Sequence, residues 1–181
     1  MGCTSSVTLA GITYDCTDVP YGGIKSLYIS RKDDTVLTMS DTDTISDLTF
    51  TATDDLVQLE FNNKDGFSNF TDVKTVDAAG SVTVVPTISV EFPKMTKAKR
   101  DELNAIANAG LELIAWVETA AGTYHCVGSE YGLYAQTING QSGASRSDKS
   151  VYQLTLTGEE NSLSLDAAAV WSLVLTPVAT P

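Results

Sequence analysis

Alternation of apolar and polar residues dominates the chain between residues 24 and 76 and indicates β-strands. Strands of this kind bury one face and leave the other in water. The expected strands cover residues 24–29, 34–39, 48–51, 57–61 and 67–76. Turn-type residues separate them at 31–34, 62–66 and 77–80. Residues 82–92 form a longer apolar run that contains Pro86. Because proline cannot donate to a strand ladder, we expect an edge strand or a bulge there.

One segment has helical periodicity instead. Thr96 is a residue type that caps helices, and Leu103 and Ile106 follow at helical spacing. Gly110 stands where a glycine with positive φ ends many helices. The pattern therefore predicts one main helix over residues 96–109.

The C-terminal third returns to strand patterns. We expect strands at residues 111–117, 123–128, 132–138 and 151–157. Residues 167–175 fit either a helix or a strand, and their β-branched and aromatic residues favour a strand. Residues 139–150 are rich in Gly, Ser and Asn and predict an exposed loop. Together the elements predict a mainly β fold, an antiparallel β-sandwich or small barrel with one flanking α-helix. We expect a single domain over residues 1–181, with residues 1–20 as an N-terminal extension.

Charge narrows the choice of function. The 181 residues carry a formal net charge of −12, with 43% hydrophobic residues. That charge disfavours sequence-specific DNA binding, and that hydrophobic content excludes a disordered acidic tail. Residues 94–109 hold four basic and two acidic residues, whereas the segments on both sides are acidic. This asymmetry suits head-to-tail self-assembly, although a solvated helix face would give the same pattern.

Few residues suited to catalysis or metal binding are present. The chain has one histidine, His125, and three cysteines without metal-site spacing. Catalysis at His125 needs an adjacent nucleophile and an orienting group, and the sequence indicates neither. The acidic run 41–47 lacks the glycine and the glutamate of a calcium loop. We predict no catalytic, cofactor or metal site.

Membrane association is not expected either. No apolar run reaches the roughly 18 residues that span a bilayer. Residues 1–6 fit a myristoylation pattern at Gly2, with Cys3 as a palmitoylation candidate, but no basic cluster follows as a second membrane signal.

The order of these elements and several short stretches resemble a family of phage proteins. The stretches are 11–16, 22–29, 92–95, 99–100 with Leu103, 127–133, 142–143 and 152–160. They resemble virion structural proteins of tailed phages and prophages of Bacteroidetes hosts, in the tail-tube or neck-ring class. The resemblance implies a β-sandwich or small barrel with one helix that assembles into rings around the channel for the genome.

This resemblance sets the functional expectations. We expect a virion protein, assembled in the host cytoplasm, that binds itself in six- or twelve-fold rings and binds other virion proteins. DNA would pass through without specific binding, because acidic walls repel phosphate. The alternative is a non-catalytic β-sandwich adhesin or carbohydrate-binding module, which should carry a signal peptide or an exposed aromatic platform. A hydrolase is a distant third hypothesis.

The loop 139–150 is the candidate assembly arm. Arg146 and Lys149 are the only cations after residue 100 and could pair with the acidic segment 40–47 of a neighbouring copy. The other hypothesis is a plain hairpin tip. The candidate interface residues are Asn139, Gly140, Ser142, Gly143, Arg146 and Lys149.

Overall fold

The computed structural model describes residues 22–51, 56–61, 67–108 and 110–175. Their elements are β1 (Ile24–Arg31), β2 (Thr35–Met39), β3 (Ile45–Phe50), β4 (Leu56–Gln58), β5 (Asn69–Val76), β6 (Val82–Pro93), α1 (Lys97–Asn108), β7 (Leu113–Thr119), β8 (Tyr124–Val127), β9 (Leu133–Gln141), β10 (Val151–Gly158), β11 (Leu165–Asp166), the 3₁₀ turn η1 (Ala168–Val170) and α2 (Trp171–Leu175). The predicted extension 1–20, with Gly2, Cys3 and Cys16, and the predicted turn 62–66 lie outside the described residues.

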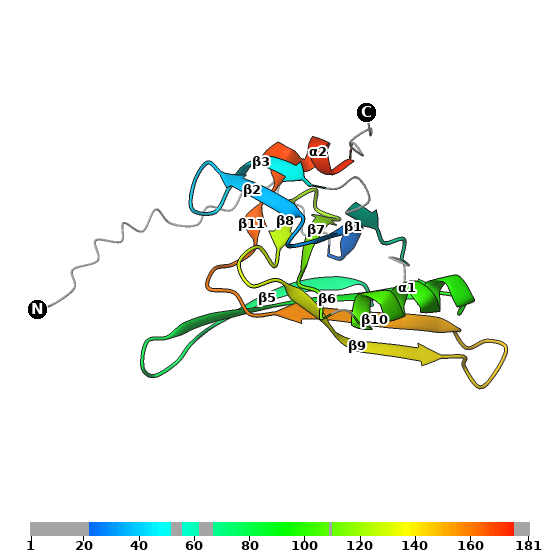
Figure 1. Cartoon of the computed structure of the whole chain (residues 1–181). Helices are drawn as coiled ribbons and strands as arrows, with labels where there is room; N and C mark the ends of the chain where they lie inside the picture. Colours follow the sequence, from blue (N-terminus) through cyan, green and yellow to red (C-terminus); the bar gives the residue numbers. More distant parts are fainter. Residues whose placement is uncertain (1–21, 52–55, 62–66, 109, 176–181) are drawn as a thin grey trace, which may run out of the picture.

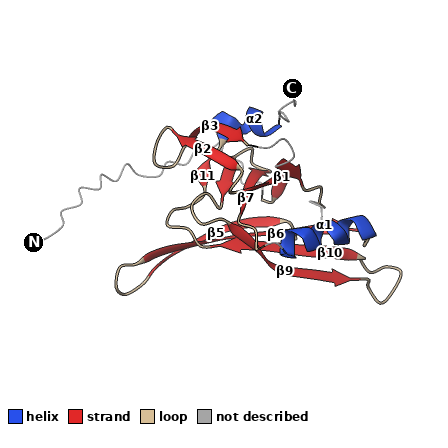
Figure 2. Ribbon diagram, in the orientation of Figure 1, coloured by secondary structure: helices blue, strands red, loops and turns tan. Residues whose placement is uncertain are grey.

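The strands form two antiparallel layers that face each other (Figures 1 and 2). The five-stranded layer has the order β4-β1-β7-β8-β11, and the four-stranded layer has the order β9-β10-β6-β5. Leu113 of β7 pairs with Leu133 of β9 and joins the two layers. The mainly β, antiparallel fold with a flanking helix is therefore confirmed, as an open sandwich.

The main hydrophobic core lies between the two layers. Alternate residues of each strand point into it, as a period of two predicts. Its fully buried members include Leu27, Ala115, Val117, Ile88, Val90, Leu133, Leu154 and Leu156. Leu103 of α1 is also buried there, with Ile106 packed beside it, so α1 extends the core past the end of the five-stranded layer.

α1 has the ends that the sequence predicts. The hydroxyl of Thr96 accepts the backbone N–H of Lys99 at 3.3 Å, which is an N-cap contact. Gly110 has a φ of +53°, in the region that glycine enters without strain.

A second core covers the other face of the five-stranded layer. Trp116 is fully buried there, and its indole N–H donates to the hydroxyl of Ser30 at 3.1 Å. The β2–β3 hairpin and the segment after β11 pack over it. The predicted strand at 167–175 is wrong, because this segment forms η1 and α2. Its buried residues are Ala167, Val170, Trp171 and Val174, which is the spacing of a helical face.

Pro86 lies inside β6 although β6 is paired on both sides, so an edge strand there is wrong. β5 pairs with β6 along all of β5, and β10 pairs with β6 from Thr87 to Pro93, with no bulge in either register. The N–H of Val84 donates to the carbonyl of Glu160 on the β10 side. N–H groups two residues apart on a strand point the same way. The backbone nitrogen of Pro86, which has no hydrogen, therefore faces β10 just beyond Thr87, where the continuous β6–β10 pairing ends.

Candidate assembly surfaces

The predicted loop 139–150 is shorter than the sequence suggests. Asn139 and Gly140 belong to β9, where they pair with Gln153 and Tyr152 of β10. Pairing with a long, regular partner strand overrides the low strand propensity of Asn and Gly. The connection between β9 and β10 is therefore residues 142–150.

Gly140 has a packing role in this hairpin. A Cβ at this position would lie 2.8 Å from the ring of Tyr152 and 3.0 Å from the terminal methyl group of Met95. The absence of a side chain lets Tyr152 and Met95 approach the strand. Gly140 thus has a structural reason for being glycine that is independent of assembly.

The remaining connection is ordered by its own hydrogen bonds. The carboxylate of Asp148 accepts the backbone N–H groups of Ser145 and Ala144, at 2.7 and 2.8 Å. These bonds, that of Ser145 first, lower the pKa of the Asp148 carboxyl. Gly143 has a φ of +75°, and Ser142 and Gly143 are exposed at the start of the turn.

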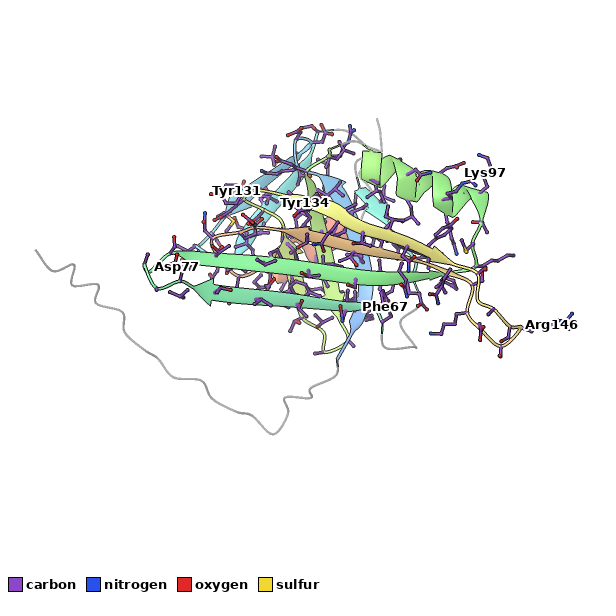
Figure 3. The ribbon with its side chains drawn as sticks, turned by 90° about the horizontal axis from the view of Figure 1, so that it is seen from below. Phe67, Asp77, Lys97, Tyr131, Tyr134 and Arg146 are labelled. Carbon is purple, nitrogen blue, oxygen red and sulfur yellow. The ribbon has the colours of Figure 1, made fainter. Side chains whose placement is uncertain are left out.

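The two loop cations have different surroundings. Arg146 is exposed at the tip of the loop, which projects beyond the body of the molecule (Figure 3). Lys149 instead turns back onto its own sheet, and its Nζ lies 3.4 Å from Oε1 of Glu91. Glu91 is 4% exposed, and its Oε2 accepts a hydrogen bond from Gln153 at 3.3 Å. Of the two, Arg146 is the better placed to reach another copy.

The outer face of the four-stranded layer is broad and carries few charged side chains. The registers place on it the residues opposite in phase to the core positions: Asn69, Thr71, Val73 and Thr75 of β5, Thr83, Val85, Thr87, Ser89 and Glu91 of β6, Val151, Gln153, Thr155 and Thr157 of β10, and Tyr134, Thr137, Asn139 and Gln141 of β9. Among these residues Glu91 is the one charged side chain, and it is buried. Hydroxyl and amide groups therefore dominate this face.

Both edges of the four-stranded layer are open. β5 pairs with β6 alone, and β9 pairs with β10 and, through Leu133, with β7. Within the described ranges no strand lies beside β5 on its other side, or beside residues 134–141 of β9. An open edge presents backbone N–H and C=O groups to which another chain can pair. The β5 and β9 edges are therefore candidate lateral interfaces.

The two ends of this layer differ in charge. At the end formed by residues 91–102 and 141–151, six cations outnumber four carboxylates. We call this the basic end; Lys97 and Arg146 mark it in Figure 3. At the opposite end, residues 74–83, 128–132 and 158–162 hold four carboxylates and one lysine. Asp77 lies at this acidic end.

His125 forms a chain of hydroxyl contacts. Its Nε2 lies 3.0 Å from the hydroxyl of Thr123, and its Nδ1 lies 3.2 Å from that of Ser164. Both ring nitrogens thus face hydroxyl groups, whereas in a Ser-His-Asp triad a carboxylate accepts from one of them and orients the base. Burial raises the pKa of the neighbouring thiol of Cys126, which keeps it from forming the nucleophilic thiolate. The expectation of no catalytic site stays a prediction.

Two exposed tyrosines lie close together in the sequence, Tyr131 at the acidic end and Tyr134 on the outer face of β9. Tyr131 is 57% exposed and Tyr134 is 53% exposed (Figure 3). The hydroxyl of Tyr131 accepts a hydrogen bond from the side-chain amide of Asn161 at 3.0 Å. Exposed aromatic rings of this kind could stack on a sugar, so this feature bears on the carbohydrate-binding alternative.

Metal-binding clusters and membrane-spanning helices are absent from the described part of the chain. It contains no group of three His, Cys, Asp or Glu side chains arranged to hold a metal ion. No helix within the described ranges has the length and apolar character needed to cross a bilayer. Comparison of the chain with protein-family models, with curated proteins and with solved structures finds no match.

Proposed function

We propose that the protein is a structural subunit of a phage virion that assembles into rings lining the DNA channel of a tail tube or neck. The observation that carries this proposal is the four-stranded layer with its neutral polar outer face and two open edges. Edge-to-edge pairing of copies would join these layers into one continuous sheet.

The chemistry of the outer face suits a surface that DNA passes without binding. Binding of a phosphate backbone depends on lysine and arginine side chains that release counterions. Among the described residues that the registers place on the outer face there is no lysine or arginine, and Lys149, which turns onto this face, is paired with the buried Glu91. The carboxylates lie mainly elsewhere, so the lining is neutral instead of acidic as the net charge suggested. Hydrated hydroxyl groups would separate the wall from the DNA.

The width of the layer favours six copies over twelve. Strands lie about 4.8 Å apart, so six layers of four strands would close a barrel roughly 115 Å around and roughly 37 Å across. Side chains narrow this to a lumen somewhat wider than a DNA duplex. Twelve copies would double the diameter and leave most of the channel empty.

A carbohydrate-binding module is the second candidate. Tyr131 and Tyr134 support it, because exposed aromatic rings provide apolar faces for sugar rings. The open edges and the charge difference between the two ends have no role in that function. The two hypotheses therefore differ in oligomeric state as well as in ligand.

Native mass spectrometry of the full-length chain over a range of protein concentrations tests the proposal. We expect a closed species of six copies that forms without ligand. A variant that carries Lys74→Pro removes a backbone N–H that points to the open side of β5 and should remain monomeric, while Lys74→Ala, which keeps this N–H, serves as the matched control. A monomeric parent that binds glycans on an array, and loses this binding in Tyr131→Ala, would contradict the proposal.

A further inference from the structure

The hairpin between β5 and β6 carries apolar side chains beyond the end of the body. We call residues 74–83 the β5–β6 tip, which projects away from the remaining elements in Figure 1. Val84 and Glu160 form the last bridge between β6 and its other neighbour, so past this point β5 and β6 are the only described strands that pair with each other. A two-stranded ribbon of this kind has little stability of its own in water.

Two valines of the tip continue the row of core-facing positions. Val76 and Val82 are cross-strand partners in phase with the buried Val84 and Ile88. Val84 and Ile88 are 0% exposed, whereas Val76 is 61% and Val82 is 38% exposed. The apolar row of β6 therefore extends past the core that covers it. Such a pair, standing clear of the body on a ribbon, marks a contact surface.

A groove with an apolar lining lies at the basic end. It runs between α1 and β4 and has a volume of about 340 Å³. Its apolar lining includes Val57, Leu59, Phe92, Leu103 and Ile106. The first two turns of α1, which carry Lys97, Lys99 and Arg100, lie beside it.

We propose that the β5–β6 tip of one copy binds in this groove of the next copy. Both surfaces carry both signs: the tip holds Asp77 and Lys74, and the charged residues that line the groove are Lys99, Glu60 and Glu102. Asp77 at the turn would face Lys99, and Lys74 would face the glutamates. The tip and the groove lie at opposite ends of the four-stranded layer, so the contact is head to tail and repeats from copy to copy. The proposal rests on the ring assembly above: rings close through the β5 and β9 edges and stack through the tip.

Substitution of the two valines tests the contact. Val76→Thr with Val82→Thr keeps β-branched side chains on the ribbon and removes apolar surface. We expect rings of this variant to stack about tenfold more weakly or worse in sedimentation velocity, with the thermal midpoint of the subunit unchanged. Val36→Thr is the matched control, because Val36 is 54% exposed on β2, away from tip and groove. Asp77→Asn keeps the oxygen that accepts the N–H groups of Ala79 and Ser81 and should make stacking less sensitive to salt.

Disulfide trapping locates the partner surface. In the full chain with Cys3→Ser and Cys16→Ser, Val76→Cys is combined with Ala98→Cys at the groove. Oxidation should give a reducible ladder of multimers, whereas each single cysteine variant should stop at dimers. Rings that stack normally without valines 76 and 82, or that give no ladder, would overturn the tip contact and leave the ring proposal standing. Rings that form but never stack would also overturn the tip contact and leave the ring proposal standing. A chain that stays monomeric at every concentration would overturn both.

Discussion

Replacement of Lys149 by methionine should lower the stability of the folded subunit itself, independently of any contact between copies. Lys149 is the cation next to Glu91, a residue that is 4% exposed on the outer face of the four-stranded layer. Met has nearly the same length and apolar stem but cannot compensate the buried charge. After the substitution, the described partner left to Glu91 is the side-chain amide of Gln153.

The expected loss of stability follows from the exposure and the distance of the Lys149–Glu91 pair. Exposed ion pairs contribute about 0–1 kcal/mol, and loss of one partner from a fully buried pair costs about 3–5 kcal/mol. Lys149 is 48% exposed, its Nζ lies 3.4 Å from the carboxylate, and Gln153 remains. We therefore expect a loss of about 1–2 kcal/mol in the free energy of unfolding. For a chain of this length that lowers the melting temperature by about 2–8 °C.

A double-mutant cycle in urea measures this contact directly. Glu91→Gln removes the charge that needs the cation, so Lys149→Met should cost about 1 kcal/mol less in the Glu91→Gln background than in the parent. The cycle separates the Glu91 contact from the other interactions of the lysine. An equal loss in both backgrounds, or a Lys149→Met variant within about 0.3 kcal/mol of the parent, would refute the reasoning.

Three further predictions concern stability. Gly128→Ala should lower the free energy of unfolding by about 2–4 kcal/mol, because the φ of Gly128 is +86° and the new Cβ would lie 2.8 Å from the carbonyl oxygen of Leu113. Urea denaturation measures this loss, and an unchanged stability would contradict the prediction. Trp116→Phe should cost about 2–3 kcal/mol through the lost hydrogen bond to Ser30 and a smaller ring, and a loss below about 1 kcal/mol would count against that contact. Burial raises the pKa of Glu160 above its ordinary value of 4.5, so its folded form binds the proton more tightly than its unfolded form. The contribution of Glu160 to stability should therefore fall as the pH rises from its unfolded pKa through its folded pKa, and Glu160→Gln should remove that part of the slope.

The elements that the sequence predicts correctly depend on local signals. The period-two pattern at residues 151–157 places Leu154 and Leu156 in the core, and the cap at Thr96 places the start of α1. Each of these signals is complete within a few residues, because side-chain alternation and capping are properties of the strand or helix itself.

The errors concern features that distant residues decide. Gly140 is a strand residue because β10 pairs with it, and Pro86 is tolerated because the β10 ladder stops next to it. Segment 167–175 has strand-like composition, but the spacing of Val170, Trp171 and Val174 already fitted a helical face. Spacing was the better signal there.

The candidate assembly surfaces were only partly accessible from the sequence. The excess of cations at the start of α1 is visible in the residue order, and the structure adds Arg146 to the same end. Val76 and Val82 look like ordinary core residues in the sequence. Only the registers show that this pair extends beyond the core that covers the rest of β6.

Electron cryo-microscopy of the assembled full-length protein tests the central claim most directly. The account predicts six-fold rings in which the outer face of the four-stranded layer, with Thr87 and Thr155 near its centre, lines the lumen, and neighbouring copies meet at β5 and β9. Monomers at every concentration, or rings whose lumen is lined by the β2–β3 hairpin and α2, would contradict it.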